Sequence, residues 1–504
     1  MINEDNSSVF LDIFIIQIVL ALISGIILAI PFLISAWPLL VILSLVIAII
    51  ILSRAHSYKR AAALGAGFGL AFFLLQSSWV LALAEFAGGW AYVGWLALCL
   101  IEASGFIGFS VGLKVIHRKV SNWLFQALLA GLLFVSLEIV RSLGWWAYPW
   151  GLVGIPLVDI KPVAKIAAFT GWPGLSFLAV FASFIIALAI EKVVQSKSGI
   201  VPHSTYRELS PYGAFLAVIA LISLLYSFLP TTNNQLPSTK VSIIQTDVSM
   251  LDKWRPQKQK QNLDQLKSLL LKVPKDTKIV FAPESSLPGM FPDNREPLKK
   301  LNAASKADLV IGSLREKDGS TYNSALSEKV SGIYDKNNLV LFGENVPFKF
   351  LFNYIKPLEE SIMPGKQAQL LGKTAVLICS ESADALYARR LVNLGADLIA
   401  VISNDSWFGK SSLAAQHLQL SRLRAIENGR FLVMSSNGGY SAIIDSEGKI
   451  LAKTKFGKRA VLNGYVDRHS KKTFYSKYGY LITWLFVLAG FAPLLIISLY
   501  LVYY

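Results

Sequence analysis

Eight long apolar stretches constrain the fold of this chain more than any other feature of its sequence. They span residues 9–30, 31–52, 62–85, 90–113, 122–140, 172–190, 212–229 and 480–501. Each approaches the roughly 20 residues that an α-helix needs to cross a bilayer. Only 16% of the 504 residues are charged, whereas soluble domains carry about 25%. The pattern therefore predicts a multi-pass α-helical membrane bundle of about eight transmembrane helices.

The distribution of Lys and Arg predicts the topology of this bundle. The loops after the second, fourth and sixth stretches carry Arg54, Lys114 and Lys192 with further basic residues. The positive-inside rule assigns such loops to the cytoplasm, so residues 231–475, which follow the seventh stretch, are expected outside it. The same loops explain the formal charge of +16, which therefore does not indicate a nucleic-acid partner.

The apolar stretches divide the chain into three segments. Residues 1–230 are expected to form a seven-helix transmembrane domain, and 476–504 a C-terminal transmembrane helix. Between them, 231–475 contains short apolar runs such as KIVFAPE, KTAVLICS and ADLIAVIS, which alternate with helical stretches such as AAQHLQLSRLRAIENG. Such alternation is typical of an α/β domain. The sequence thus predicts an extracytoplasmic α/β domain carried by a membrane bundle.

Three polar residues of this domain lie at positions where α/β folds commonly carry catalytic or ligand-binding side chains. Glu284 and Cys379 each end an apolar strand, and Lys336 lies at a hairpin turn; ligands and reacting groups gather at such strand ends. Taken singly, each residue could have a structural role without any catalytic one. A cysteine after a buried strand, for example, is usually an inert apolar residue. The only other cysteine, Cys99, lies in a membrane stretch, so we expect Cys379 to be a free thiol.

Other catalytic classes fit this domain poorly. It contains two histidines, His417 and His469, which excludes a three-histidine zinc site within it. A Ser-His-Asp enzyme would have to use one of these two, and no G-x-S-x-G motif accompanies them.

Taken together, the motifs FAPES, YDKNNLVLFGE and LICSE resemble the nitrilase superfamily, in which Glu, Lys and Cys occur in this order. Within it, the whole chain resembles the apolipoprotein N-acyltransferase family, also in SNDSWFG, RAIENGR and the membrane segments RSLGWWAYPWG and TGWPGLSFL. The resemblance implies an αββα fold for the outer domain. It implies Glu284 as general base, Lys336 as thiolate and oxyanion stabiliser, and Cys379 as nucleophile.

The resemblance also assigns supporting roles. Glu344 would orient Lys336, and Glu381 would be a carboxylate beside the nucleophile. Trp254, Phe348 and Trp407 lie on predicted loops with other aromatic residues, where contact with lipid is favoured over ordinary packing. The chain departs from the family pattern at Ser380, Leu341 and Asn345, which bears on the fit of acyl chain or acceptor and leaves the three reacting residues intact.

The implied reaction is a ping-pong N-acylation. A membrane phospholipid, by resemblance phosphatidylethanolamine, would acylate Cys379, and the thioester would pass to the amino group of an apolipoprotein's diacylglyceryl-cysteine. The implied enzyme is a monomer in the bacterial inner membrane, with its catalytic domain on the periplasmic side and without metal or cofactor. Two alternatives remain open: a membrane-tethered amidase that uses water as acceptor, and a transporter or scaffold with an inactive outer domain.

Overall fold

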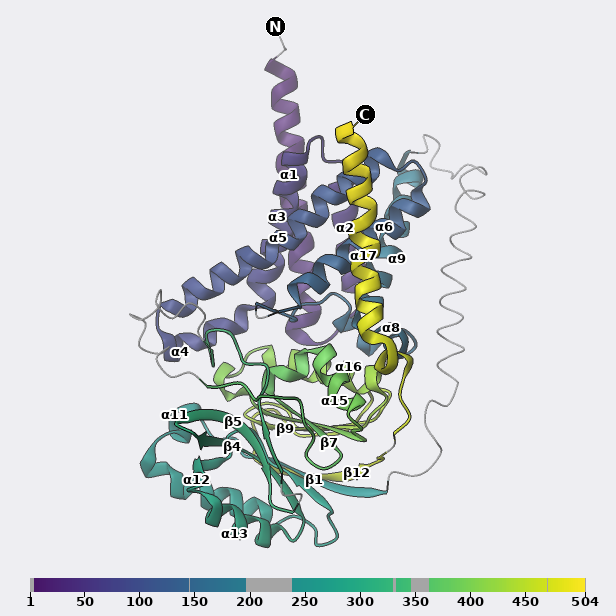
Figure 1. Cartoon of the computed structure of the whole chain (residues 1–504). Coiled ribbons are helices and arrows are strands. Elements are labelled where there is room, and N and C mark those ends of the chain that lie inside the picture. The colour runs from purple at the N-terminus through teal and green to yellow at the C-terminus, as the bar shows by residue number, and fades with distance from the viewer. Residues whose placement is uncertain are drawn as a thin grey trace. The chain divides into compact units, whose positions relative to one another are not determined.

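The structure is a computed structural model in which residues 4–144, 146–195, 238–329, 332–345, 362–468 and 470–503 are described. It consists of two compact units (Figure 1). The membrane unit comprises Met1–Leu81, Gly89–Leu229 and Tyr480–Tyr504, and the second unit comprises Ala82–Gly88 and Pro230–Gly479.

Six helices of the described residues are long and apolar enough to cross a membrane, which confirms a multi-pass helical bundle. They are α1 (Glu4–Ile34), α3 (Tyr58–Gln76), α5 (Trp90–Lys119), α6 (Trp123–Arg141), α9 (Trp172–Gln195) and α17 (Phe474–Tyr503). A seventh apolar helix, α2 (Leu40–Ser53), has 14 residues. The predicted stretch 212–229 lies outside the described residues.

Two predicted helix boundaries were wrong. Helix α1 continues through Pro31 to Ile34, and the chain breaks only before Pro38. The break falls there because a proline disfavours helical backbone at the residue before it, and Trp37 has a φ of 56°. The stretch predicted to reach residue 85 leaves the α-helix at Gln76 and continues as the 3₁₀ helix η1 (Ser78–Leu83) and the short helix α4 (Ala84–Ala87).

Three charged side chains of the membrane unit, Arg141, Glu102 and Glu138, form ion pairs with one another. Arg141 at the end of α6 lies 3.2 Å from Glu102 and 3.7 Å from Glu138, and it also donates to the backbone oxygens of Tyr148 and Trp150. Charges at membrane depth are tolerated when they face the bundle interior and find such partners.

Two β-sheets form the centre of the second unit. The first has the order β12-β1-β2-β4-β5-β6 with β3 beside β4, and comprises β1 (Thr239–Gln245), β2 (Ile279–Phe281), β3 (Leu287–Phe291), β4 (Asp308–Lys317), β5 (Ser320–Ser327), β6 (Gly332–Asp335) and β12 (Ala460–Val466). The second has the order β11-β10-β9-β8-β7, and comprises β7 (Thr374–Ile378), β8 (Leu398–Asn404), β9 (Leu432–Asn437), β10 (Ala442–Ile444) and β11 (Ile450–Lys453). The predicted α/β domain is therefore present.

The two faces of each sheet are buried against different layers. Successive side chains of a strand point to opposite faces: in β1, Val241 and Ile243 belong to the core that also contains β7 and β8. Ile244 instead packs with helices α12 (Pro256–Leu270) and α13 (Arg295–Ser305). Helices α15 (Ala385–Asn393) and α16 (Leu413–Asn428) cover the second sheet (Figure 1). The layers thus follow the order αββα.

Candidate active site

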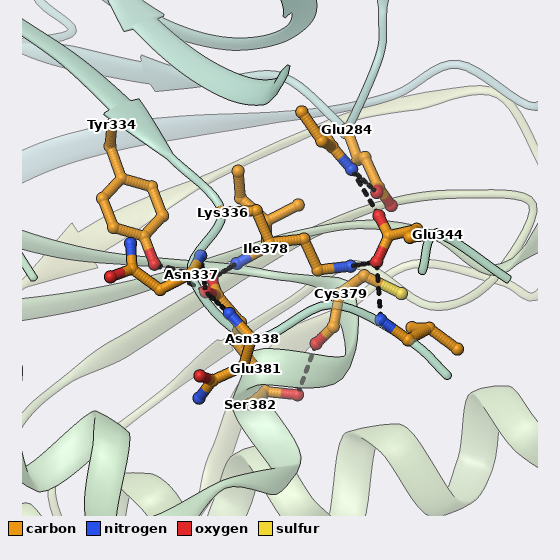
Figure 2. A network of polar contacts seen from close by, with 12 residues as sticks. Glu284, Tyr334, Lys336, Asn337, Asn338, Glu344, Ile378, Cys379, Glu381 and Ser382 are labelled. Atoms are coloured by element: carbon orange, nitrogen blue, oxygen red, sulfur yellow. Dashed lines mark hydrogen bonds and ion pairs between the residues drawn. The ribbon is translucent and has the colours of Figure 1, made fainter. Parts of the chain in front are cut away.

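The three candidate reacting residues follow strands from both sheets. Glu284 comes after β2 and Lys336 directly after β6, both of the first sheet, while Cys379 directly follows β7 of the second. Figure 2 shows the side chains of these three residues and of Glu344 directed toward one another. Residues up to 95 positions apart in sequence are brought together because the two sheets pack face to face and their strand ends meet at one edge.

A buried hydrogen-bond network joins the lysine to both glutamates. The Nζ atom of Lys336, a residue that is 1% exposed, donates to Oε2 of Glu344 over 2.6 Å. The amide of Asn323 in β5 donates to Glu284 over 2.7 Å and to Glu344 over 3.0 Å. The backbone N–H of Val340 also donates to Glu344 over 2.9 Å. Because the amide of Asn323 donates to both carboxylates, it holds the side chains of Glu284 and Glu344 close to each other.

Cys379 occupies a backbone conformation that side chains rarely adopt. Its φ is 52°, in the left-handed region that costs an L-residue of order 1–3 kcal/mol and occurs often at functional sites. The residue begins the 3₁₀ helix η4 (Cys379–Ala383), and its side chain is partly exposed. Cys379 packs against the core that contains the β7 side chains and stays partly exposed at the end of the strand.

The charges of the site favour a protonated thiol in the resting enzyme. Burial, followed by the negative charge of Glu284, raises the pKa of Cys379, and Lys336 opposes the shift. Burial also raises the pKa of Glu284, against the positive charge of Lys336. Although burial lowers the pKa of Lys336, Glu344 and the other anions raise it overall. A neutral thiol, a nearby carboxylate and a fixed cation are the groups that a base-activated nucleophile requires.

Glu381 links the two sheets behind the site. It accepts hydrogen bonds from the hydroxyl of Tyr334 and from the backbone N–H groups of Asn337, Asn338 and Ile378, over 2.7–3.1 Å. These donors lie on both sides of Lys336 and directly before Cys379 (Figure 2). The side chain is 0% exposed, so its contacts hold the lysine loop and the cysteine turn together.

Replacing Glu381 by glutamine is expected to destabilise this unit by about 2–3 kcal/mol, because the new amide would face at least one N–H donor and leave it unsatisfied. The midpoint of thermal unfolding in detergent should then fall by roughly 4–12 °C. The exposed Glu296, which pairs with Lys299, provides the control, since Glu296→Gln should leave the midpoint in place. An unchanged midpoint in Glu381→Gln would contradict the linking role.

The structure describes two of the three residues that were predicted to contact lipid. Trp254 and Trp407 are 47% and 37% exposed, and the ring of Trp407 meets that of Phe86 edge to face at 4.9 Å within the same unit. Phe348 and the whole aromatic arm at 346–355 lie outside the described residues. Leu341 and Asn345 bridge the turn that carries Glu344.

Two further polar residues at the site were missed from the sequence. Asn323 lies within β5, where the alternating pattern marks it only as a strand residue. Lys253 directly precedes Trp254 in the sequence, and its Nζ donates to the backbone oxygen of Glu284 over 2.9 Å. Burial lowers the pKa of Lys253 to about 8, against the charge of Glu284.

Comparison with known proteins assigns both units. Residues 240–473 match the carbon-nitrogen hydrolase family, and residues 24–185 match the apolipoprotein N-acyltransferase N-terminal domain. The apolipoprotein N-acyltransferase of Geobacter metallireducens is 33% identical over 383 residues, which cover 70% of each chain. That of Haemophilus ducreyi is 26% identical and covers 82% of this chain and 83% of its own length.

Among solved structures, Saccharomyces cerevisiae Nit3, a member of the nitrilase superfamily, is 19% identical with a TM-score of 0.37, covering 50% of this chain and 97% of its own. The sequence relatives decide the assignment, because one of them exceeds 30% identity over more than two thirds of its length. The chain therefore belongs to the apolipoprotein N-acyltransferase family, and it is a multi-pass membrane acyltransferase with a carbon-nitrogen hydrolase domain.

Proposed function

We propose that this enzyme transfers an acyl chain from a membrane phospholipid, phosphatidylethanolamine by preference, to the α-amino group of the S-diacylglyceryl-cysteine of an apolipoprotein. The reaction is ping-pong. Cys379 attacks the ester carbonyl of the donor, a lysophospholipid leaves, and the acceptor amine then attacks the thioester. The observation that carries the proposal is the convergence of Glu284, Lys336 and Glu344 on the thiol of Cys379 (Figure 2).

Each residue contributes a separate step. Glu284 takes the thiol proton and returns it to the alcohol that leaves the donor, as a general base and then a general acid. Lys336 stabilises the thiolate and the oxyanion of each tetrahedral intermediate. Glu344 holds Lys336 in place and orients the neutral amine of the acceptor. As the N–C bond forms and the C–S bond breaks, Glu284 takes a proton from the amine and returns it to the thiolate of Cys379. The exposed tryptophans Trp254 and Trp407, together with Phe348, contact the lipid.

Intact-protein mass spectrometry after incubation with phospholipid and no acceptor tests the intermediate. The mass should rise by one acyl group, the peptide that contains Cys379 should carry it, and adding a diacylated lipopeptide should remove it. Steady release of free fatty acid without N-acylated peptide would instead identify a hydrolase that uses water. A mass that never changes would exclude the thioester.

The membrane topology is part of the proposal. Residues 231–475 form the catalytic domain on the periplasmic side of the inner membrane of a bacterium, between the bundle 1–230 and the final helix 476–504, and the enzyme acts as a monomer. The basic residues of the even-numbered loops support this orientation.

Cysteines introduced at exposed positions test this orientation of the catalytic domain. In a background that carries both Cys99→Ala and Cys379→Ala, Lys272→Cys should react with a membrane-impermeant maleimide in intact spheroplasts, because it lies in the catalytic domain. Lys59→Cys, in the first turn of α3 just after the loop that follows α2, should react only after permeabilisation. The reverse pattern would place the domain in the cytoplasm.

A further inference from the structure

The backbone turn that carries Glu284 is held from two sides. On one side, the N–H of Gly312 in β4 donates to the oxygen of Pro283 over 3.2 Å, and a Cβ atom on Gly312 would lie only 2.5 Å from Cα of Glu284. On the other side, Nζ of Lys253 donates to the backbone oxygen of Glu284 over 2.9 Å. Ser285 then turns the chain with a φ of 47°, in the left-handed region. The position of Glu284 therefore depends on a side chain from a different segment.

The segment that carries Lys253 has anchors that do not involve the lysine. Lys253 ends the short helix α11 (Met250–Lys253), and the hydroxyl of Ser249 caps the first turn of this helix. Val248, two residues before the helix, exchanges hydrogen bonds with the side chain of Asn437 in β9. Its N–H donates to Oδ1 over 2.8 Å, and its oxygen accepts from Nδ2 over 2.9 Å. Because these contacts do not use the ammonium group, a substitution of Lys253 should leave α11 in place.

Lys253 carries a buried positive charge that acts on Glu284. The residue is 9% exposed, and burial lowers the pKa of its amine to about 8, against the charge of Glu284, so the amine is protonated at neutral and lower pH. Burial raises the pKa of Glu284, and the charge of Lys336 opposes this shift. Glu344 raises that pKa further, whereas the Asn323 amide and Lys253 lower it. A neutral donor would satisfy the backbone oxygen of Glu284 without the cost of burying a charge, so the ammonium group indicates an electrostatic role.

We propose that Lys253 is a positioning residue for acyl transfer, which fixes the turn of Glu284 and keeps the carboxylate of this base ionised. Only the ionised carboxylate can take the proton of Cys379. Among the described residues, the charged or titratable groups that act on Glu284 are Lys336, Glu344, Cys379 and Lys253. Lys336 shares its charge with Glu344, to which its Nζ donates, whereas Lys253 is bonded to Glu284 itself. The inference rests on the proposed function only in taking Cys379 as the nucleophile and Glu284 as its base.

The pH profile of acyl-enzyme formation from p-nitrophenyl butyrate tests this role without any phospholipid. The sulfur of Cys379 attacks the ester carbonyl, Glu284 takes the thiol proton, and p-nitrophenolate leaves without needing a proton, so the acid limb of the profile follows the ionisation of Glu284. Lys253→Met removes the cation and raises the pKa of Glu284, so the midpoint of the acid limb should move up by about 1 pH unit, which makes acylation about tenfold slower below it. The Cys379→Ala variant supplies the background rate.

Two further variants separate charge from structure. Lys253→Arg keeps a cation and an N–H donor and should keep the midpoint near that of the parent. Lys240→Met removes a lysine of β1 that pairs with the exposed Asp276 and should leave the profile unchanged.

The inference is overturned if Lys253→Met keeps the midpoint of the parent, or if its rate falls by the same factor at every pH, which would indicate a structural role alone. Should Lys253→Met show no cooperative thermal unfolding, Lys253→Gln keeps a donor without the charge, and a parent midpoint in that variant overturns the inference. An enzyme that shows the shift with p-nitrophenyl butyrate but is never acylated by phospholipid would refute only the proposed donor.

Discussion

Replacing Cys379 by alanine will abolish acyl transfer, with a loss on the order of 10⁶ in kcat, the size found when a covalent enzyme loses its nucleophile. The chain's other cysteine, Cys99, lies in α5 of the membrane unit. The measurement is N-acylation of a diacylated lipopeptide in detergent with excess phospholipid, together with the mass of the enzyme.

Two variants control this experiment. Cys99→Ala should retain activity, which separates loss of the nucleophile from loss of a buried thiol. Cys379→Ser keeps the shape of the side chain and replaces the thiol with a hydroxyl of much higher pKa, so it should be inactive or trap a stable ester. Acyl-enzyme that still accumulates in Cys379→Ala would assign the intermediate to another residue.

Changing the two charged partners of the thiol will shift its reactivity in opposite directions. Glu284 raises the pKa of Cys379 and Lys336 lowers it. Glu284→Gln should therefore move the alkylation profile to lower pH, and Lys336→Met should move it to higher pH. Acyl transfer should fall in both variants: the first has no base to carry the proton to the leaving alcohol, and the second loses oxyanion stabilisation worth about 10²–10³ in rate.

The lysine variant needs its own control, because Lys336→Met leaves the buried Glu344 without its ion-pair partner, and breaking such a pair costs about 3–5 kcal/mol. Lys336→Met combined with Glu344→Gln removes both charges and should recover much of the stability without recovering activity. The decisive data are paired pH profiles of alkylation and acyl-enzyme formation. If high pH restored acylation fully in Lys336→Met, the lysine would stabilise only the thiolate, and the oxyanion role would be wrong.

Features that depend on local pattern could be predicted from the sequence. The length of apolar runs predicted the membrane helices, because crossing a bilayer requires about 20 apolar residues in succession. Short apolar runs ending in polar residues located Glu284 and Cys379 at strand ends. The motif resemblance supplied Lys336 and Glu344, and the matching relatives confirmed the family. Helix ends were less certain, as the course of α1 through Pro31 shows.

The hydrogen bonds between polar side chains that are distant in sequence could be found only from the tertiary structure. Asn323 contacts Glu284 and Glu344 across 39 and 21 positions of sequence. The hydrogen bonds that join His417 to Ser382 and to Asp405 exist because α16 packs against both η4 and the 3₁₀ helix η5 (Asp405–Phe408). The sequence predicted no role for His417, because no serine-hydrolase motif accompanies it. Hydrogen bonds between remote segments depend on side-chain geometry to within a few tenths of an ångström, and that geometry is fixed by the packing of the two sheets and their helices, which leaves no periodic signal along the chain.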